Sequence, residues 1–287
     1  MVAAFPARFQ PWLTYRQDGT YTIDADVESA TVIEGKFLYL DHSILNHFGH
    51  FIADSLSRIW AWDFLKGLPG FESLKLVVGE NIQPFGEALL AGFGVRGSDV
   101  VKISEPTVFE DLYVSTPGFS VQNYTSPAAH SVWRRIRTSM AVPGAYPSRI
   151  YVSRAGAELR RLLNESAVER LFEAHGFTIV HPEAIPVAEQ VNLFSHAQLI
   201  AGPGGSNLYN LAFQGRLRSL FLLVSNVFVQ NPELMFCAFH DVTVWCFIGT
   251  ADASHPDYAA HRPRVPWTVD EARLAQAVRD WLASVGS

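Results

Sequence analysis

Three polar side chains near position 50 have the types and the spacing of a catalytic or metal-binding group. His47, His50 and Asp54 are three and four positions apart, which places them on one face of a helix. An imidazole with a carboxylate partner can act as a general base, because its ordinary pKa is about 6.5 and the carboxylate fixes its tautomer. Two histidines and one carboxylate can also bind a metal ion. A third interpretation is a capping and salt-linking polar face on a buried helix.

A second set of candidates is basic. Arg154 stands at the expected end of a strand, and Arg160 and Arg161 follow it closely. A guanidinium suits a diphosphate, because it donates paired hydrogen bonds and does not lose its charge. The alternative is a solvated arginine cluster that pairs with Glu158 and Glu165.

The third candidate is a glycine-rich turn from Gly202 to Asn207, between an expected strand and an expected helix. Glycine allows the backbone to approach a phosphate closely, and free N–H groups at a helix start attract an anion. The turn is not the dinucleotide fingerprint, which requires glycine at position 207, and it is not a P-loop, which requires Gly-Lys-Ser/Thr. A tight turn that binds nothing is the alternative.

Alternating strands and helices must position these candidates. In the first half, apolar runs and helical periodicity predict strands at 36–40, 74–78, 100–103 and 112–115 and helices at 43–66, 84–90 and 128–140. A stretch rich in proline and glycine at 141–148 predicts a linker.

The second half predicts a more regular alternation. The expected strands are 149–153, 177–180, 199–201, 217–224 and 242–247, with helices between them and two capping boxes at Ser166–Glu169 and Thr268–Glu271. Such alternation implies parallel sheets, whose ligands bind at the carboxyl ends of the strands. We therefore expect an α/β chain with two Rossmann-like domains facing a cleft, at 1–145 and 146–265. A C-terminal helix at 266–287 is expected to pack back on the first domain.

The composition limits the possible functions. The chain has 287 residues, and 22 basic against 28 acidic residues give a net charge of −6, which argues against a nucleic-acid binder. Cys237 and Cys246 are too few for a disulfide scaffold or a four-cysteine zinc site. The sequence shows neither a leader pattern nor an apolar stretch of the roughly 20 residues that span a bilayer. We therefore expect a soluble cytoplasmic protein.

Two blocks of the sequence together resemble glycosyltransferase family 61. The longer block begins with Arg149-Ile-Tyr-Val-Ser-Arg154 and continues through Arg160-Arg161, Asn164-Glu165, Gly176-Phe177, Pro182-Glu183, Glu189-Gln190, His196-Ala197 and the turn from Gly202 to Asn210. The shorter block, His50-Phe-Ile-Ala-Asp54-Ser-Leu-Ser-Arg58, is similar to the family's aromatic-rich helix with a histidine and an acid. The two blocks cover about a quarter of the chain.

The resemblance implies a GT-B fold and the inverting transfer of a sugar from a nucleotide-diphosphate donor, a UDP-sugar, without a cofactor or an obligatory metal. The implied acceptor is a glycan or lipid-linked saccharide of cell-surface polysaccharide synthesis, with peripheral membrane contact. His50, supported by Asp54, would take the proton of the acceptor hydroxyl. The implied contacts to the donor diphosphate are Arg154, Arg160, Arg161, Gly204, Gly205, Ser206 and Asn207, and further site residues are His47, Asn164, Glu189, Gln190 and Asn210.

Two positions depart from the family's pattern. The family has a histidine where this chain has Gly204, and an asparagine where it has His47. The first departure favours an alternative, a non-catalytic carbohydrate- or nucleotide-binding protein of the same fold. A metal-dependent hydrolase that uses His47, His50 and Asp54 is the other alternative.

Overall fold

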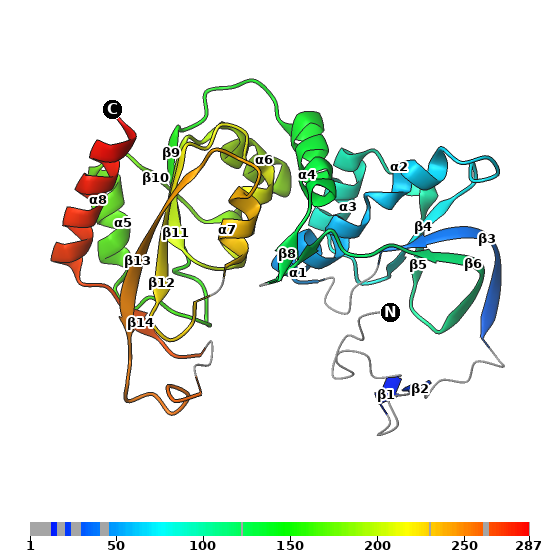
Figure 1. Ribbon diagram of the computed structural model, residues 1–287, viewed down its shortest axis with the longest axis horizontal. Helices are drawn as coiled ribbons and strands as arrows, with labels where there is room; N and C mark the ends of the chain where they lie inside the picture. Colours follow the sequence, from blue (N-terminus) through cyan, green and yellow to red (C-terminus); the bar gives the residue numbers. More distant parts are fainter. Residues whose placement is uncertain are drawn as a thin grey trace. The chain divides into compact units, whose positions relative to one another are not determined.

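A computed structural model divides the chain into two compact units, Met1–Gly118 and Phe119–Ser287 (Figure 1). It describes residues 13–15, 21–23, 30–40, 46–121, 123–229, 231–260 and 264–286. The division falls at Gly118 and not at residue 145, because helix α4 (Pro127–Met140) packs against α6 (Val187–His196) of the second unit.

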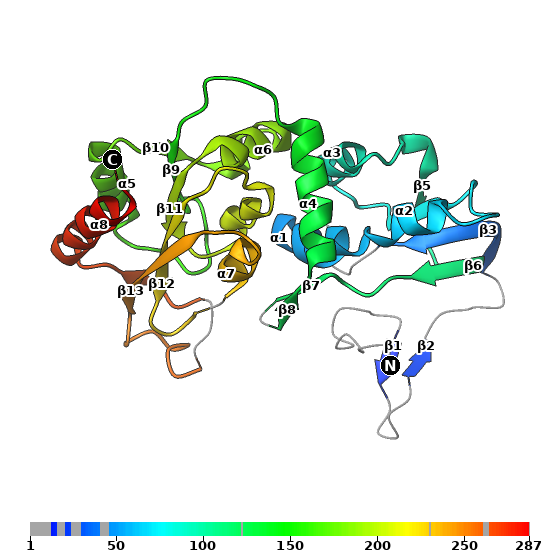
Figure 2. The same cartoon turned by 45° about the horizontal axis from the view of Figure 1, so that its top comes forward.

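The first unit contains a parallel sheet in the order β5-β4-β3-β6. Its strands are β3 (Thr31–Tyr39), β4 (Lys75–Gly79), β5 (Val100–Ile103) and β6 (Thr107–Val114). Helices α2 (Ala61–Lys66) and α3 (Pro84–Phe93) lie on the same face of this sheet (Figure 2). The unit also contains a separate antiparallel pair, β1 (Leu13–Tyr15) and β2 (Tyr21–Ile23), and a short helix, η4 (Gly97–Asp99).

The single helix expected at 43–66 is wrong within the part of that range that the structure describes. The segment is α1 (Phe48–His50), a π-helical turn η2 (Phe51–Ser55), a 3₁₀ turn η3 (Leu56–Arg58) and then α2. From residue 51 to residue 59, every side chain except that of Asp54 is buried. A regular amphipathic helix buries only one face. Because this segment is buried on nearly all sides, its backbone conformation is set by packing with its neighbours and not by a single helical periodicity.

The second unit contains a six-stranded sheet in the order β10-β9-β11-β12-β13-β14, which is parallel except for the last pair. Its strands are β9 (Arg149–Val152), β10 (Thr178–Val180), β11 (Leu199–Pro203), β12 (Ser219–Ser225), β13 (Thr243–Ala251) and β14 (Trp267–Thr268). The expected α/β class with parallel sheets is therefore confirmed.

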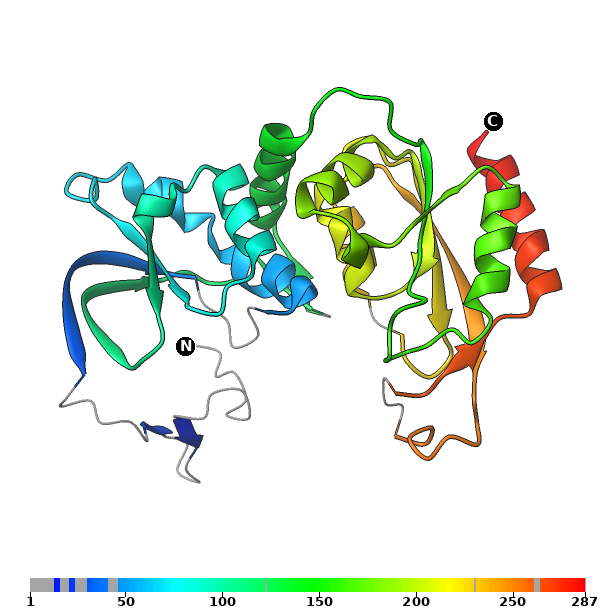
Figure 3. The same ribbon diagram turned by 180° about the vertical axis from the view of Figure 1, so that it is seen from behind.

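Helices cover both faces of this sheet. Figures 1 and 3 show α5 (Glu165–Ala174) and α8 (Glu271–Val285) on one face, and α6 and α7 (Pro232–Cys237) on the other. The remaining elements are a short hairpin, β7 (Phe119–Ser120) with β8 (Tyr124–Thr125), and two 3₁₀ helices, η5 (Pro182–Ala184) and η6 (Ser206–Phe213).

The C-terminal helix packs within its own unit. Trp281 of α8 is fully buried, contacts the rings of Phe177 and Phe221, and donates its indole N–H to Ser219 Oγ at 2.8 Å. Its apolar face packs on the sheet of the second unit and not, as expected, on the first domain, because this face of the sheet needs an apolar cover. Burial of each large apolar side chain contributes about 1.5–3 kcal/mol.

Both predicted capping boxes are misplaced. The N-cap of α8 is Asp270, whose carboxylate accepts from Arg273 N–H at 3.0 Å. Helix α5 begins one residue before Ser166, and Glu169 accepts a hydrogen bond from Ser153 Oγ at 2.6 Å. Glu169 thus accepts a hydrogen bond from Ser153, and not from the backbone N–H at the helix start that a capping box would use.

Candidate functional site

The order of strands in the second unit defines where a ligand site belongs. The chain runs from β9 to β10 on one side of the sheet, then returns to place β11 on the other side of β9. In open parallel sheets, ligands bind at the carboxyl ends of the strands where this reversal occurs. Arg154 follows β9, and the glycine-rich turn follows β11. The fold therefore brings two of the sequence candidates to one sheet edge.

Arg154 lies directly against the glycine-rich turn. Arg154 is only 4% exposed, and its Nη2 donates a hydrogen bond to Leu159 O at 3.1 Å. Gly205 has φ +151°, and a Cβ built there would overlap the Arg154 guanidinium. Burial, followed by the charge of Arg160, lowers the pKa of Arg154 to about 10. Arg154 thus remains a cation at neutral pH, and the interpretation as a solvated arginine is wrong.

A buried carboxylate holds the main chain of Arg154. Glu165 Oε1 accepts from Arg154 N–H at 2.6 Å and from Ser153 Oγ at 3.3 Å. Burial raises the pKa of Glu165, and the neighbouring Glu169 raises it further. Glu165 therefore orients the backbone at Arg154 and does not pair with its guanidinium in the expected surface cluster.

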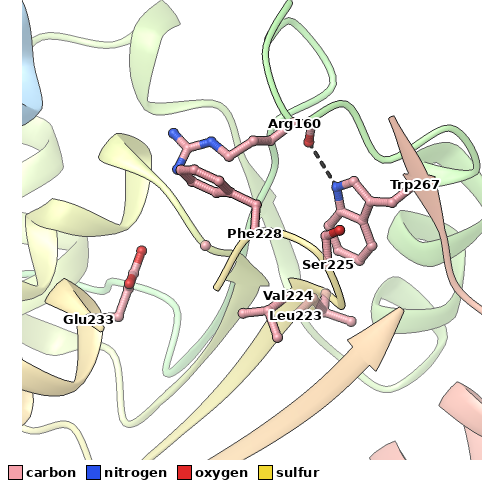
Figure 4. Close-up of a pocket in the computed structure, with 8 residues that line it drawn as sticks. Arg160, Leu223, Val224, Ser225, Phe228, Glu233 and Trp267 are labelled. Atoms are coloured by element: carbon pink, nitrogen blue, oxygen red, sulfur yellow. Dashed lines mark hydrogen bonds between the residues drawn. The ribbon is translucent and has the colours of Figure 1, made fainter. Parts of the chain in front are cut away.

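Arg160 lines a pocket at the same sheet edge. The pocket is formed by Arg160, Gly204, Leu223, Val224, Ser225, Phe228, Glu233 and Trp267 (Figure 4). Figure 4 shows the Arg160 side chain along the ring of Phe228. The guanidinium carbon lies 5.3 Å from the ring centre. Trp267 Nε1 donates to Arg160 O at 2.9 Å, and burial lowers the pKa of Arg160. Arg161, by contrast, is exposed and does not line this pocket.

Glu233, which sequence reasoning missed, completes this pocket. It stands in the first turn of α7, is 2% exposed, and accepts the N–H of Gly205 at 2.7 Å. Burial raises its pKa, against the effect of the Gly205 hydrogen bond and of Arg160 and Arg154. No motif marks this acid in the sequence. The available signal is a Pro-Glu pair at a helix start, just beyond a buried strand.

The backbone of the turn differs from the expectation. The N–H of Gly204 donates to Leu223 O at 2.9 Å, and the N–H of Gly205 donates to Glu233. A phosphate would therefore have to replace Glu233 at Gly205. Ser206 begins η6, which is a 3₁₀ helix.

Asn207 belongs to the turn, whereas other predicted residues support the framework. Asn207 Nδ2 donates to Ser153 O at 3.0 Å and to Glu183 Oε2 at 3.2 Å, which ties the turn to the end of β9. Asn210 and Gln190 are buried and hydrogen-bonded to each other at 2.8 Å.

Two further predicted residues lie on helix starts of this unit. Asn164 exchanges hydrogen bonds with the backbone of Val269, at 2.9 and 3.2 Å. Glu189 lies half-buried in the first turn of α6. Asn164, Gln190 and Asn210 thus connect elements of the second unit, a structural role.

In the first unit, His50 and Asp54 form the predicted pair. His50 Nδ1 lies 2.7 Å from Asp54 Oδ2, and the two side chains are 40% and 15% exposed. With Nδ1–H donated to Asp54, Nε2 is the basic nitrogen of His50. His47 caps α1 by accepting the N–H of His50 at 3.4 Å. The segment follows the carboxyl end of β3, where the sequence placed it.

Two alternatives can be compared with the described part of the chain. Among these residues, no three histidine, cysteine or acidic side chains are placed to hold a metal ion together, so His47, His50 and Asp54 do not form the alternative metal site. The same residues include no helix that is both long and apolar enough to cross a membrane.

Comparisons with known proteins identify a family. The model of the family described as Glycosyltransferase 61 matches residues 48–219, more than half of the 287 residues. No curated protein matches the chain. A solved structure of the dodecameric iron-containing heptosyltransferase TibC with ADP-D-beta-D-heptose is similar, with 9% identity, a TM-score of 0.45, and 96% of this chain and 82% of that chain covered. Another TibC structure, from enterotoxigenic E. coli H10407, has 12% identity, a TM-score of 0.40, and coverage of 90% and 72%.

Proposed function

The chain belongs to glycosyltransferase family 61 and is a glycosyltransferase, and from this premise we propose that it transfers a sugar from a UDP-sugar to a glycan hydroxyl with inversion and without a metal. The observation that supports this proposal most is the contact between Arg154 and Gly205, at the point where the strand order of the parallel sheet reverses. A fixed cation at this edge is suited to a diphosphate, which carries its charge on oxygens.

In this proposal, two arginines stabilise the departing diphosphate. Arg154 is buried and Arg160 lines the pocket beside the turn. Cations that are already in place stabilise charge that develops on a leaving group, with little reorganisation during the reaction. The two guanidinium groups would thus replace the metal ion that other sugar transferases use.

The acceptor hydroxyl is activated by His50. Its Nε2 takes the hydroxyl proton while the oxygen attacks the anomeric carbon from the face opposite the diphosphate, and the bond from that carbon to the diphosphate oxygen breaks. Asp54 stabilises the resulting imidazolium through the hydrogen bond to Nδ1. The proposal assigns the donor to the second unit and the acceptor to the first, the division of roles in a GT-B enzyme.

Thermal unfolding with UDP tests the donor class, because a ligand that binds the folded state raises the Tm. We expect UDP to raise the Tm of the wild-type protein and Arg154→Ala to abolish the shift. Arg170→Ala, which removes an exposed arginine on α5, is the matched control and keeps it. A wild-type protein that responds to no nucleoside diphosphate at millimolar concentration would overturn the proposed donor.

Product analysis tests the rest of the proposal. A panel of UDP-sugars is incubated with cell-surface polysaccharides and lipid-linked saccharides, and the anomeric configuration of the product is determined by NMR. We expect inversion, and activity that survives EDTA. Retention of configuration, or activity that is lost with EDTA and restored by Mg²⁺ or Mn²⁺, would overturn the respective part of the mechanism.

A further inference from the structure

The pocket contains an acid where a phosphate would bind. Glu233, on α7, contacts the glycine-rich turn through Gly205 and lines the same pocket as Arg160. Building on the proposed function, we propose that Glu233 is an internal counter-anion of the donor site. It holds the empty site in its binding geometry, and it accepts a proton from solvent when a nucleotide diphosphate binds beside Arg154 and Arg160.

One oxygen of Glu233 makes the contact that a phosphate oxygen makes at a glycine-rich turn. Its Oε1 accepts the N–H of Gly205 at 2.7 Å, and a Cβ built on Gly204 would lie 3.5 Å from the same atom. Figure 4 shows Glu233 and Arg160 on the wall of one pocket. The cavity volume is about 20 Å³, room for about one water, so a nucleotide sugar must extend beyond this pocket.

The titratable groups that interact with Glu233 come from three elements. Arg154 and Arg160 face it from the segment after β9, Cys237 from its own helix α7, and Cys246 from β13. Burial and the charge of Glu233 raise the pKa of Cys237 to about 12 and raise that of Cys246 as well. Both thiols are therefore neutral at pH 7. Two guanidinium groups and the carboxylate of Glu233 then carry charge beside the turn, and the carboxylates of Glu165 and Glu183 act on Arg154 as well.

A bound diphosphate reverses this balance. It adds at least two negative charges beside the same arginines, and like charges in a site of low dielectric constant strongly disfavour each other. Burial already disfavours the charged form of Glu233. Taking one proton from solvent removes the repulsion and turns the carboxyl group into a donor to a phosphate oxygen. The proton returns to solvent when the nucleoside diphosphate leaves.

Calorimetric titration with UDP, repeated in buffers of different ionisation enthalpy, counts the protons that binding takes up. At pH 7.5 the terminal phosphate of UDP is mostly ionised, since its second pKa is about 6. We expect the wild-type protein to take up as much as one proton for each UDP, and its Kd to rise up to about tenfold for each unit that the pH rises.

Two variants assign this proton to Glu233. Glu233→Gln retains an oxygen acceptor for Gly205 but does not titrate, so we expect proton uptake and the pH dependence of Kd to be lost. Glu173→Gln, which changes an exposed acid on α5, retains both.

Three outcomes would overturn the inference. Equal proton uptake by the wild-type protein and Glu233→Gln is one. Wild-type binding without proton uptake is the second, and it needs no variant, so it decides the question even if Glu233→Gln does not fold. A wild-type protein that binds no nucleoside diphosphate at all overturns the proposed function, and the inference with it.

Discussion

At the scale of single residues, the contact between Gly205 and Arg154 leaves no room for a side chain at Gly205. A methyl group on Gly205 would overlap the buried guanidinium, and such overpacking costs about 1–3 kcal/mol. We expect Gly205→Ala to lower the Tm and to abolish the Tm shift with UDP. In Gly97→Ala the new methyl group meets nothing within 4 Å, so this control keeps both. A normal UDP response in Gly205→Ala would show that Arg154 is not needed in its present place.

Arg154→Lys separates the charge of this residue from its shape. Lysine keeps the positive charge but loses the planar fork that binds two phosphate oxygens. We expect the Kd for UDP to rise about 10–100-fold, which corresponds to the roughly 1.5–3 kcal/mol of a charged hydrogen bond. Titration calorimetry measures this, and an unchanged Kd would mean that charge alone is sufficient.

His50 and Asp54 are expected to affect transfer and not donor binding. Loss of a general base reduces rates by about 10²–10⁴-fold. We therefore expect His50→Ala to lower kcat in this range, and Asp54→Asn to lower it less, because the imidazole remains. The Kd for UDP, measured in parallel, stays at the wild-type value for both variants. A His50→Ala protein with normal kcat would remove the proposed base.

Single residues also show what the sequence can predict about the site. Arg154 and Asn207 lie within a few residues of the ends of β9 and β11, so the expected strands were enough to place both at the carboxyl ends of the sheet. Glu233 escaped prediction because its role depends on a hydrogen bond to Gly205, 28 positions away. The same limit applies to Gln190 and Asn210, whose mutual hydrogen bond gives them a structural role that spacing does not reveal.

At the scale of elements, ends that are set by local chemistry were predicted best. Helix α3 begins at Pro84 and ends before Gly94, whose φ of +107° suits glycine. The segment around His50 was predicted poorly, because burial on nearly all sides decides its π and 3₁₀ turns. Even so, His50 and Asp54 meet there, because a spacing of four residues keeps them close.

Helix α4 carries a group that makes stability depend on pH. Burial and, next, the charge of His240 lower the pKa of His130 to about 4 from its ordinary 6.5. The folded state therefore binds a proton less readily than the unfolded chain. The contribution of neutral His130 to the free energy of unfolding is fully present above about pH 6.5 and is lost progressively as the pH falls toward 4.

Urea unfolding at several pH values measures this effect. We expect the free energy of unfolding of the wild-type protein to fall between pH 7 and pH 4.5, and His130→Gln to show a smaller fall. His181→Gln, at an exposed position, is the control with the wild-type profile. Identical slopes for wild type and His130→Gln would assign the pH dependence to other groups.

At the scale of the whole molecule, alternation of strands and helices was enough to predict parallel sheets, but not which elements pack together. The partners of α4 and α8 lie in the second unit, and an amphipathic pattern shows that a helix has an apolar face without showing what covers it. The expected domain boundary near residue 145 and the expected packing of the C-terminal helix on the first domain both required knowing which elements pack against each helix.

The proposed donor site requires a folded second unit, so we expect the loss of a core side chain there to weaken UDP binding. Trp281→Ala removes a fully buried ring, and such changes cost about 3–5 kcal/mol. We expect a large fall in Tm and in the UDP-bound fraction near the new Tm, measured by calorimetry. Phe64→Ala removes an aromatic side chain that is 64% exposed, so its effect stays within about 0.5 kcal/mol. A small effect of Trp281→Ala would contradict the packing of α8.

In the proposed donor site, the hydrogen bond from Gly205 to Glu233 would also affect which anions can bind. A carboxylate that is tethered in place competes for this N–H at a high effective concentration, because its binding is intramolecular. A small anion must compete with Glu233 for this N–H and has only the two arginines as further partners. A nucleotide sugar has its base, ribose and sugar to bind with, so it can displace Glu233 where a small anion fails. In this proposal, Glu233 makes the site selective for ligands that also bind through groups other than the phosphate.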